Sequence, residues 1–114
     1  CLAAQRKGMV IKMKEFEKEL DFVYDEIEDA EKYARAALEL KATDPETAQL
    51  YARLSQEEMN HMTLLHQDVA RRIEKYKRDT GHQPSEAMQA IYDYTHRRSI
   101  AAAEKVADLQ KMYR

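Results

Sequence analysis

The sequence has very few of the residues that interrupt regular structure or cross-link it. In 114 residues there are two glycines, two prolines, no tryptophan and one cysteine, Cys1. A single cysteine cannot form an internal disulfide, which suits a reducing compartment and leads us to expect a cytoplasmic location. Turns draw heavily on glycine and proline, so a protein of many short strands is excluded.

Long hydrophobic runs and an excess of positive charge are also missing. No apolar stretch is long enough to cross a bilayer, and the first residues lack the apolar segment of a secretory signal. The net charge is −2, so we expect no nucleic acid partner. The chain is 44% hydrophobic and 35% charged, which is typical of long amphipathic helices. We therefore expect an all-α protein with one domain over residues 1–114.

Three helices are predicted, over about residues 9–41, 45–78 and 85–112, after a loose tail of about eight residues. The first helix has an unbroken apolar stripe in alternating steps of three and four residues, which indicates packing against other helices. The stripe consists of Met13, Phe16, Leu20, Val23, Ile27, Ala30, Ala34 and Ala37. The third helix has a comparable apolar side, which includes Met88, Ile91, Ala102, Val106, Leu109 and Tyr113.

The links between the predicted helices are short. Asp44 followed by Pro45 suits the N-terminus of the second helix, and Thr43 with Glu46 would form a capping box instead. With either start, the first two helices should form a long antiparallel hairpin. Gly81 is well placed to cap the end of the second helix.

The second helix has two polar residues in its predicted apolar stripe, which runs Tyr51, Leu54, Glu58, His61 and Leu65. An unpaired carboxylate buried there would cost several kcal/mol, which a bound metal ion would offset. Residues three apart on a helix are about 5–6 Å apart at Cβ, so Glu58 and His61 can reach one ion. The alternatives are a buried hydrogen-bonded pair and a slightly rotated stripe that leaves both side chains half exposed.

A second carboxylate can come from the facing helix. Glu26 lies about 17 residues before Thr43 and Glu58 about 15 residues after it, so the two are level to within one helical turn. Two carboxylates and an imidazole suit iron or manganese. Because other acidic residues surround Glu26, it could instead be a solvated charge paired with lysine or arginine.

Glu26, Tyr33 seven residues later, and Glu58-x-x-His61 resemble the ferritin-like di-iron family. Rubrerythrins and ferritins share these spacings, and the resemblance covers roughly residues 20–78. In this class a Glu from each of two helices, and Glu-x-x-His from each of two others, bind the metal ions. This chain has half of that set, which resembles the encapsulated ferritins, where two protomers complete the site.

The resemblance implies a four-helix core completed by a homodimer or higher homo-oligomer, with one iron ion per chain and manganese as a possible substitute. It implies Fe(II) oxidation by O₂ or peroxide, for iron storage or detoxification. Glu58 would bridge the ions, His61 and Glu26 would be terminal ligands, and Tyr33 would be a hydrogen-bond donor or electron source. The resemblance also places Glu28 near the path by which iron enters. An encapsulin-type shell, enclosing the protein in a cytoplasmic nanocompartment, is a further implied partner.

Two other functions fit the same residues. The helices could serve assembly alone, in a metal-free oligomerisation or adaptor protein, or they could hold a single structural metal such as zinc. In the third helix, Asp93-x-x-His96 has the spacing of the metal motif. The aromatic and arginine residues around it favour a surface or interface pair instead.

Overall fold

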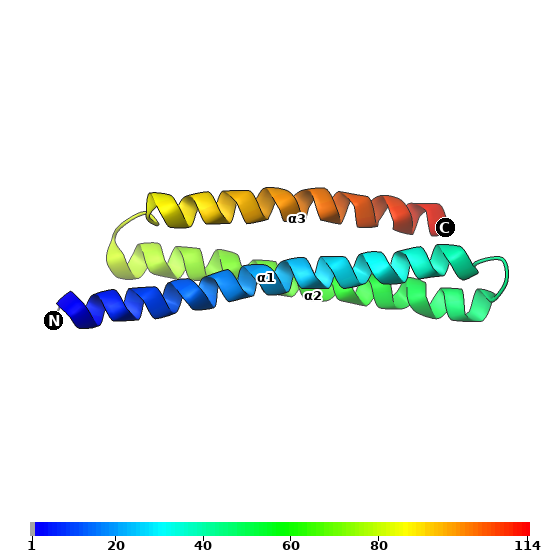
Figure 1. Cartoon of the computed structure of the whole chain (residues 1–114), viewed down its shortest axis with the longest axis horizontal. Helices are drawn as coiled ribbons and strands as arrows, with labels where there is room; N and C mark the ends of the chain where they lie inside the picture. Colours follow the sequence, from blue (N-terminus) through cyan, green and yellow to red (C-terminus); the bar gives the residue numbers. More distant parts are fainter. Residues whose placement is uncertain (1) are drawn as a thin grey trace.

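The chain folds into three α-helices, shown in Figure 1: α1 (Leu2–Leu40), α2 (Pro45–Thr80) and α3 (Glu86–Tyr113). The computed structural model describes the backbone of residues 2–114 and the side chains of residues 14–114. Within that part of the chain there is no strand, and no helix is long and apolar enough to cross a membrane. The predicted all-α hairpin with a third helix is confirmed.

The helix ends differ from the prediction chiefly at the N-terminus. α1 begins at Leu2, so the expected loose tail is helical, with Gly8 inside the helix at a cost of about 1 kcal/mol. Cys1 lies outside the described residues. At the start of α2, Asp44 is the N-cap: its carboxylate accepts hydrogen bonds from the backbone N–H and the hydroxyl of Thr47, at 3.2 and 2.7 Å. Gly81 ends α2 with φ of 68°, as its predicted capping role requires.

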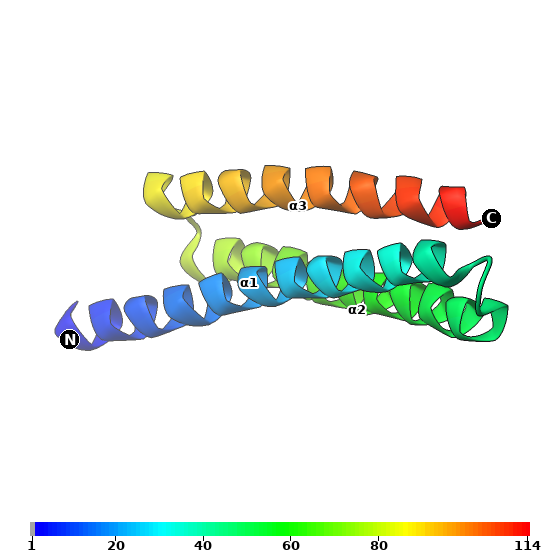
Figure 2. The same ribbon diagram turned by 45° about the vertical axis from the view of Figure 1, so that its right-hand side comes forward.

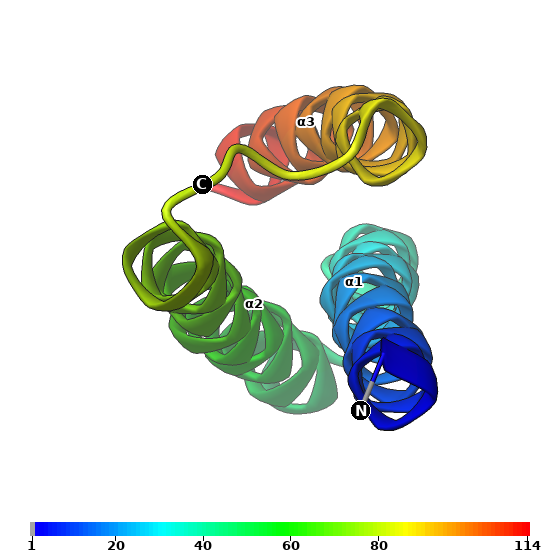
Figure 3. The same cartoon turned by 90° about the vertical axis from the view of Figure 1, so that its left-hand side faces the viewer.

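α1 is the central helix and packs against both of the others, whereas α2 and α3 barely touch each other. Figure 3, which views the molecule end-on, shows α2 and α3 splayed apart. The predicted stripe of α1 is confirmed from Phe16 to Ala37, since every one of those positions is buried. Met13, its first member, lies outside the described side chains.

The stripe predicted for α2 is wrong by one residue. The buried residues of α2 are Ala48, Ser55 and Val69. The Ser55 hydroxyl donates to the carbonyl of Ala30 at 2.7 Å and accepts from the amide of Gln110 at 3.0 Å, which satisfies it. The small side chains of Ala30 and Ser55 let α1 and α2 approach closely at this point. The hydrogen bond between these two residues turns Ser55 towards α1. The predicted stripe from Tyr51 to Leu65 therefore lies at the edge of the contact, half-buried to exposed.

α3 starts after its N-cap Ser85 and covers one side of α1. Lys105 Nζ binds Glu31 Oε1 at 2.8 Å, and the Arg98 guanidinium lies 3.9 Å from the ring centroid of Tyr24. The apolar side predicted for α3 is confirmed as buried or half-buried. At about 100° per residue, Glu31 lies roughly 140° around α1 from Glu26. α3 therefore leaves the Glu26 side of the hairpin uncovered. Figure 2 shows α3 running along one side of the hairpin.

Candidate metal centre

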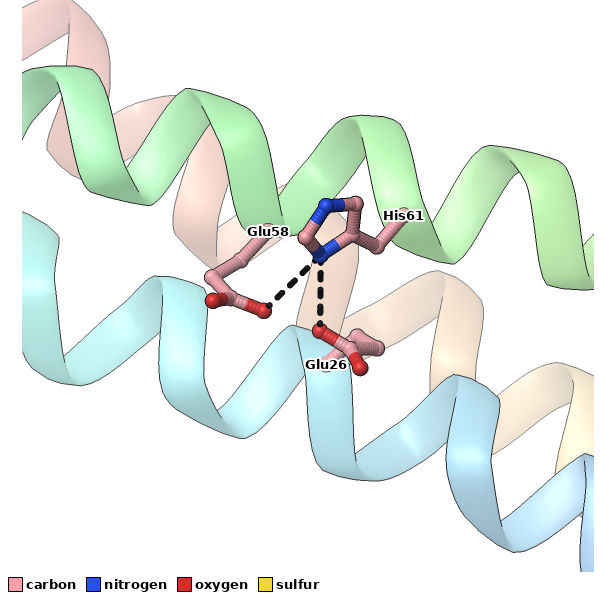
Figure 4. A group of neighbouring side chains, drawn as sticks. All are labelled: Glu26, Glu58 and His61. Atoms are coloured by element: carbon pink, nitrogen blue, oxygen red, sulfur yellow. Dashed lines mark ion pairs between the residues drawn. The ribbon is translucent and has the colours of Figure 1, made fainter.

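Three predicted ligands from two helices converge on one point. Glu26 comes from α1, and Glu58 and His61 come from adjacent turns of α2 (Figure 4). One possible ligand atom from each lies within 4.8 Å of the others. His61 Nδ1 is 3.6 Å from Glu26 Oε2 and 3.6 Å from Glu58 Oε2. Among the described residues, no other three His, Cys, Asp or Glu side chains form such a group.

The register of the hairpin brings the three side chains, which we call the Glu26 trio, to the same level. Ser55 is three residues before Glu58, and Ala30 is four residues after Glu26. Their 2.7 Å hydrogen bond thus fixes the two helices about one turn from the trio. The Asp44 cap sets the length of the link and so sets the register from the other end.

The Glu58 carboxyl group perturbs the pKa of Glu26. A hydrogen bond to Glu58 is the main cause that raises the pKa of Glu26, followed by burial and the negative charge of Glu58. Glu26 Oε2 is buried and has no hydrogen-bond partner. Two adjacent carboxylates require a shared proton or a cation between them. The oxygen and nitrogen donors of the trio suit iron, manganese or zinc.

The trio lies at the surface of the hairpin and not in its buried core. The His61 side chain is 57% exposed, and those of Glu26 and Glu58 are 27% and 20% exposed. The predicted burial of Glu58 and His61 in the packing stripe is therefore wrong, because Ser55 occupies the inward position. A single chain does not shield the trio from water.

Exposed apolar residues flank the trio on the side that α3 leaves open. Phe22, one helical turn from Glu26, is 46% exposed. Leu64, one turn from His61, is 64% exposed, and Leu50, two turns from Glu58, is 51% exposed. Large apolar side chains grouped around polar ligands mark a surface that gains stability when another molecule covers it.

No protein-family model, no curated protein and no solved structure matches this chain. Its likeness to the ferritin-like di-iron proteins rests on the residues and spacings alone.

Two other residues from the predicted iron chemistry lie apart from the trio. Tyr33, seven residues from Glu26, packs against Tyr51 with ring centroids 6.1 Å apart. Glu28 is exposed, and two residues of helix turn it about 200° around α1 from Glu26. Glu28 therefore faces away from the trio, and the proposed role of Tyr33 would act from two helical turns away.

His96 belongs to a ring stack between α2 and α3. Its ring lies 5.3 Å from that of His66 and 5.2 Å from that of Tyr92, both nearly parallel to it. Asp93 accepts a hydrogen bond from the amide of Gln89. His96 thus takes part in a contact between α2 and α3, whereas the hydrogen bond of Asp93 lies within α3. The stack with His66 gave no sequence signal, because His66 is 30 residues away.

One further polar group, centred on Glu19, was not predicted from the sequence. Glu19 is 8% exposed and, with Ser55, is one of two buried polar residues among the described side chains. Burial is the largest of the effects that raise the pKa of Glu19 to about 7, and a hydrogen bond with Asp68 adds to it. The only available signal was its place one heptad before Glu26.

Proposed function

We propose that this chain is a ferritin-like di-iron protein that oxidises Fe(II) at a site shared between two copies. The observation that carries the proposal is the convergence of Glu26, Glu58 and His61, whose ligand atoms lie within 4.8 Å of one another. The spacing of the same three residues in the sequence also indicates a metal site. The raised pKa of Glu26 beside Glu58 supports it, because a divalent cation would relieve the repulsion between two carboxylates.

A second copy supplies the rest of the ligands. One chain offers three ligand side chains, about half of the set that two ions take in this class. The exposed His61 side chain and its apolar neighbours, Phe22 and Leu64, support a partner on this face. A copy related by a two-fold axis would bring a second trio to the same point and cover both apolar surfaces.

Each residue of the trio has a separate role in this proposal. Glu58, the less exposed of the two carboxylates, would be the ligand shared between two ions, and Glu26 and His61 would each be a terminal ligand. Tyr33 lies two helical turns from Glu26 and has no step in this oxidation, because the two Fe(II) ions supply both electrons. Two Fe(II) ions give one electron each, and O₂ takes both electrons with two protons and leaves as H₂O₂. With peroxide as oxidant, the same electrons and protons yield two water molecules.

Anaerobic Fe(II) titration followed by exposure to air tests the proposal. Ferric absorbance should saturate near one iron per chain. Glu58→Ala and His61→Ala should abolish it while the helical circular dichroism is retained. Glu57→Ala and His82→Ala are matched controls, because both residues lie outside the trio, and they should oxidise iron normally.

The competing function is metal-free assembly, which the exposed apolar residues beside the trio would also serve. In that case the protein takes up no iron, its melting temperature does not change with Fe(II), and Glu58→Leu stabilises it. That set of results would rule out the iron site. A strict monomer that still binds iron would rule out the sharing of the site between copies.

A further inference from the structure

A second carboxylate pair lies on the same edge of the hairpin, one heptad from the trio. Glu19 precedes Glu26 by seven residues on α1, and Asp68 follows His61 by seven residues on α2. Seven residues of helix rise about 10.5 Å and nearly complete two turns. Glu19 and Asp68 therefore repeat the positions of Glu26 and His61 at the next level, and the side chain of Arg72 lies between them.

Arg72 contacts both carboxyl groups at once. Its Nε is 3.5 Å from Glu19 Oε1 and 3.3 Å from Asp68 Oδ2. The neighbouring Arg71 binds the other oxygen, Oδ1 of Asp68, at 2.7 Å. Arg72 is thus the only described cation that contacts both carboxyl groups, and its removal would free one oxygen on each.

The positive charge of Arg72 favours the ionised form of the Glu19 carboxyl group. The Glu19 side chain is buried, and its Oε1 atom has no hydrogen-bond partner. A buried carboxylate needs a proton or a positive charge beside it. Two carboxylate oxygens from facing helices, with water completing the shell, are also ligands for a small divalent cation such as Mn²⁺ or Fe²⁺. The guanidinium of Arg72 therefore occupies the place that such an ion would take.

We propose that Glu19 and Asp68 form a second divalent-cation site, which the Arg72 side chain keeps closed. Arg72 is then the residue that confines metal to the Glu26 trio and limits each chain to one ion. The statement that each chain binds one ion rests on the proposed function. The statement that Arg72 closes a second site does not. Replacement of Arg72 by a neutral residue should open the site, so that each chain gains one ion.

Equilibrium dialysis against Mn²⁺ with elemental analysis measures the number of ions per chain. Arg72→Gln and Arg72→Met should each bind one Mn²⁺ more than the wild type. The double variant Glu19→Gln/Arg72→Gln should lose that additional ion. Arg71→Gln is the matched control, because it removes the neighbouring guanidinium and leaves Arg72 in place, and it should bind as many ions as the wild type.

The outcomes separate this inference from the proposed function. Counts of one for the wild type and two for Arg72→Gln support both proposals. Counts of zero and one refute the Glu26 trio as a metal site and support the second site. If the folded Arg72 variants bind no more Mn²⁺ than the wild type, or if the additional ion remains after Glu19→Gln, the inference is overturned.

Discussion

Replacement of Glu19 by glutamine should remove a large part of the pH dependence of stability. The folded protein raises the pKa of Glu19 from 4.5 to about 7, chiefly through burial. The proton on Glu19 therefore stabilises the fold fully below about pH 4.5, and that stability is lost as the pH rises through about 7. Each unit of pKa corresponds to about 1.4 kcal/mol, so linkage predicts a loss of roughly 2–3 kcal/mol between about pH 5 and pH 8.

Urea denaturation followed by circular dichroism, at several pH values and with EDTA present, measures this loss. The wild type should lose roughly 2–3 kcal/mol more than Glu19→Gln between the two ends of the range, because the glutamine amide does not titrate. Titrating groups that do not contact Glu19 are shared by the two proteins and cancel in the difference. Asp68 does contact Glu19, but its pKa is lowered to about 2, chiefly by a hydrogen bond from Arg71, so it titrates below this range. Identical pH profiles for the two proteins would show that Glu19 is not a perturbed buried acid.

Three further predictions concern the hairpin and its metal centre. Asp44→Ala should lower the free energy of unfolding by about 1 kcal/mol in urea titrations, because α2 loses its N-cap bonds to Thr47. An unchanged midpoint would contradict this. Ser55→Ala should lower the free energy of unfolding by about 1–3 kcal/mol, because the Gln110 amide loses its partner and the hydrogen bond to the Ala30 carbonyl is removed; Ser99→Ala, on α3, is a control expected to cost less. Mn²⁺ affinity should rise with pH over the range in which Glu26 loses its proton, because the pKa of Glu26 is raised and the cation binds the ionised carboxylate; calorimetry in two buffers should detect the proton released in that range. An affinity independent of pH would refute that release.

The first helix was predictable because its apolar residues form one stripe and nothing competes with it. Every described position of that stripe, from Phe16 to Ala37, is buried. The second helix offers two candidate stripes. The large apolar residues Leu54 and Leu65 favoured the wrong stripe. The correct stripe contains Ser55, because a close approach of two helix backbones requires small residues.

The convergence of Glu26, Glu58 and His61 was predictable to a greater degree than the packing that supports it. The level of Glu26 with respect to Glu58 follows from counting outward from the turn, and a rotation of α2 by one residue does not change that level. The same rotation moves His61 from the core to the surface, which only the contact of Ser55 with Ala30 reveals.

The contacts of Glu19 could not be predicted because they depend on long side chains from the other helix. Nothing in the sequence connects Glu19 with Arg72, 53 residues later, until the register of the hairpin is known. The packing of α3 on α1 could not be predicted either. The apolar side of α3 was predictable, but the helix against which it packs was not. That choice determines which face of the hairpin stays open.

Native mass spectrometry of the protein loaded anaerobically with Fe(II) tests the central claim most directly, because it reports the iron count and the oligomer mass on the same particle. We predict a dimer that carries two iron ions, and no iron on Glu58→Ala at the same protein concentration. Iron bound to a monomer, or a dimer that stays free of iron at saturating Fe(II), would contradict the account.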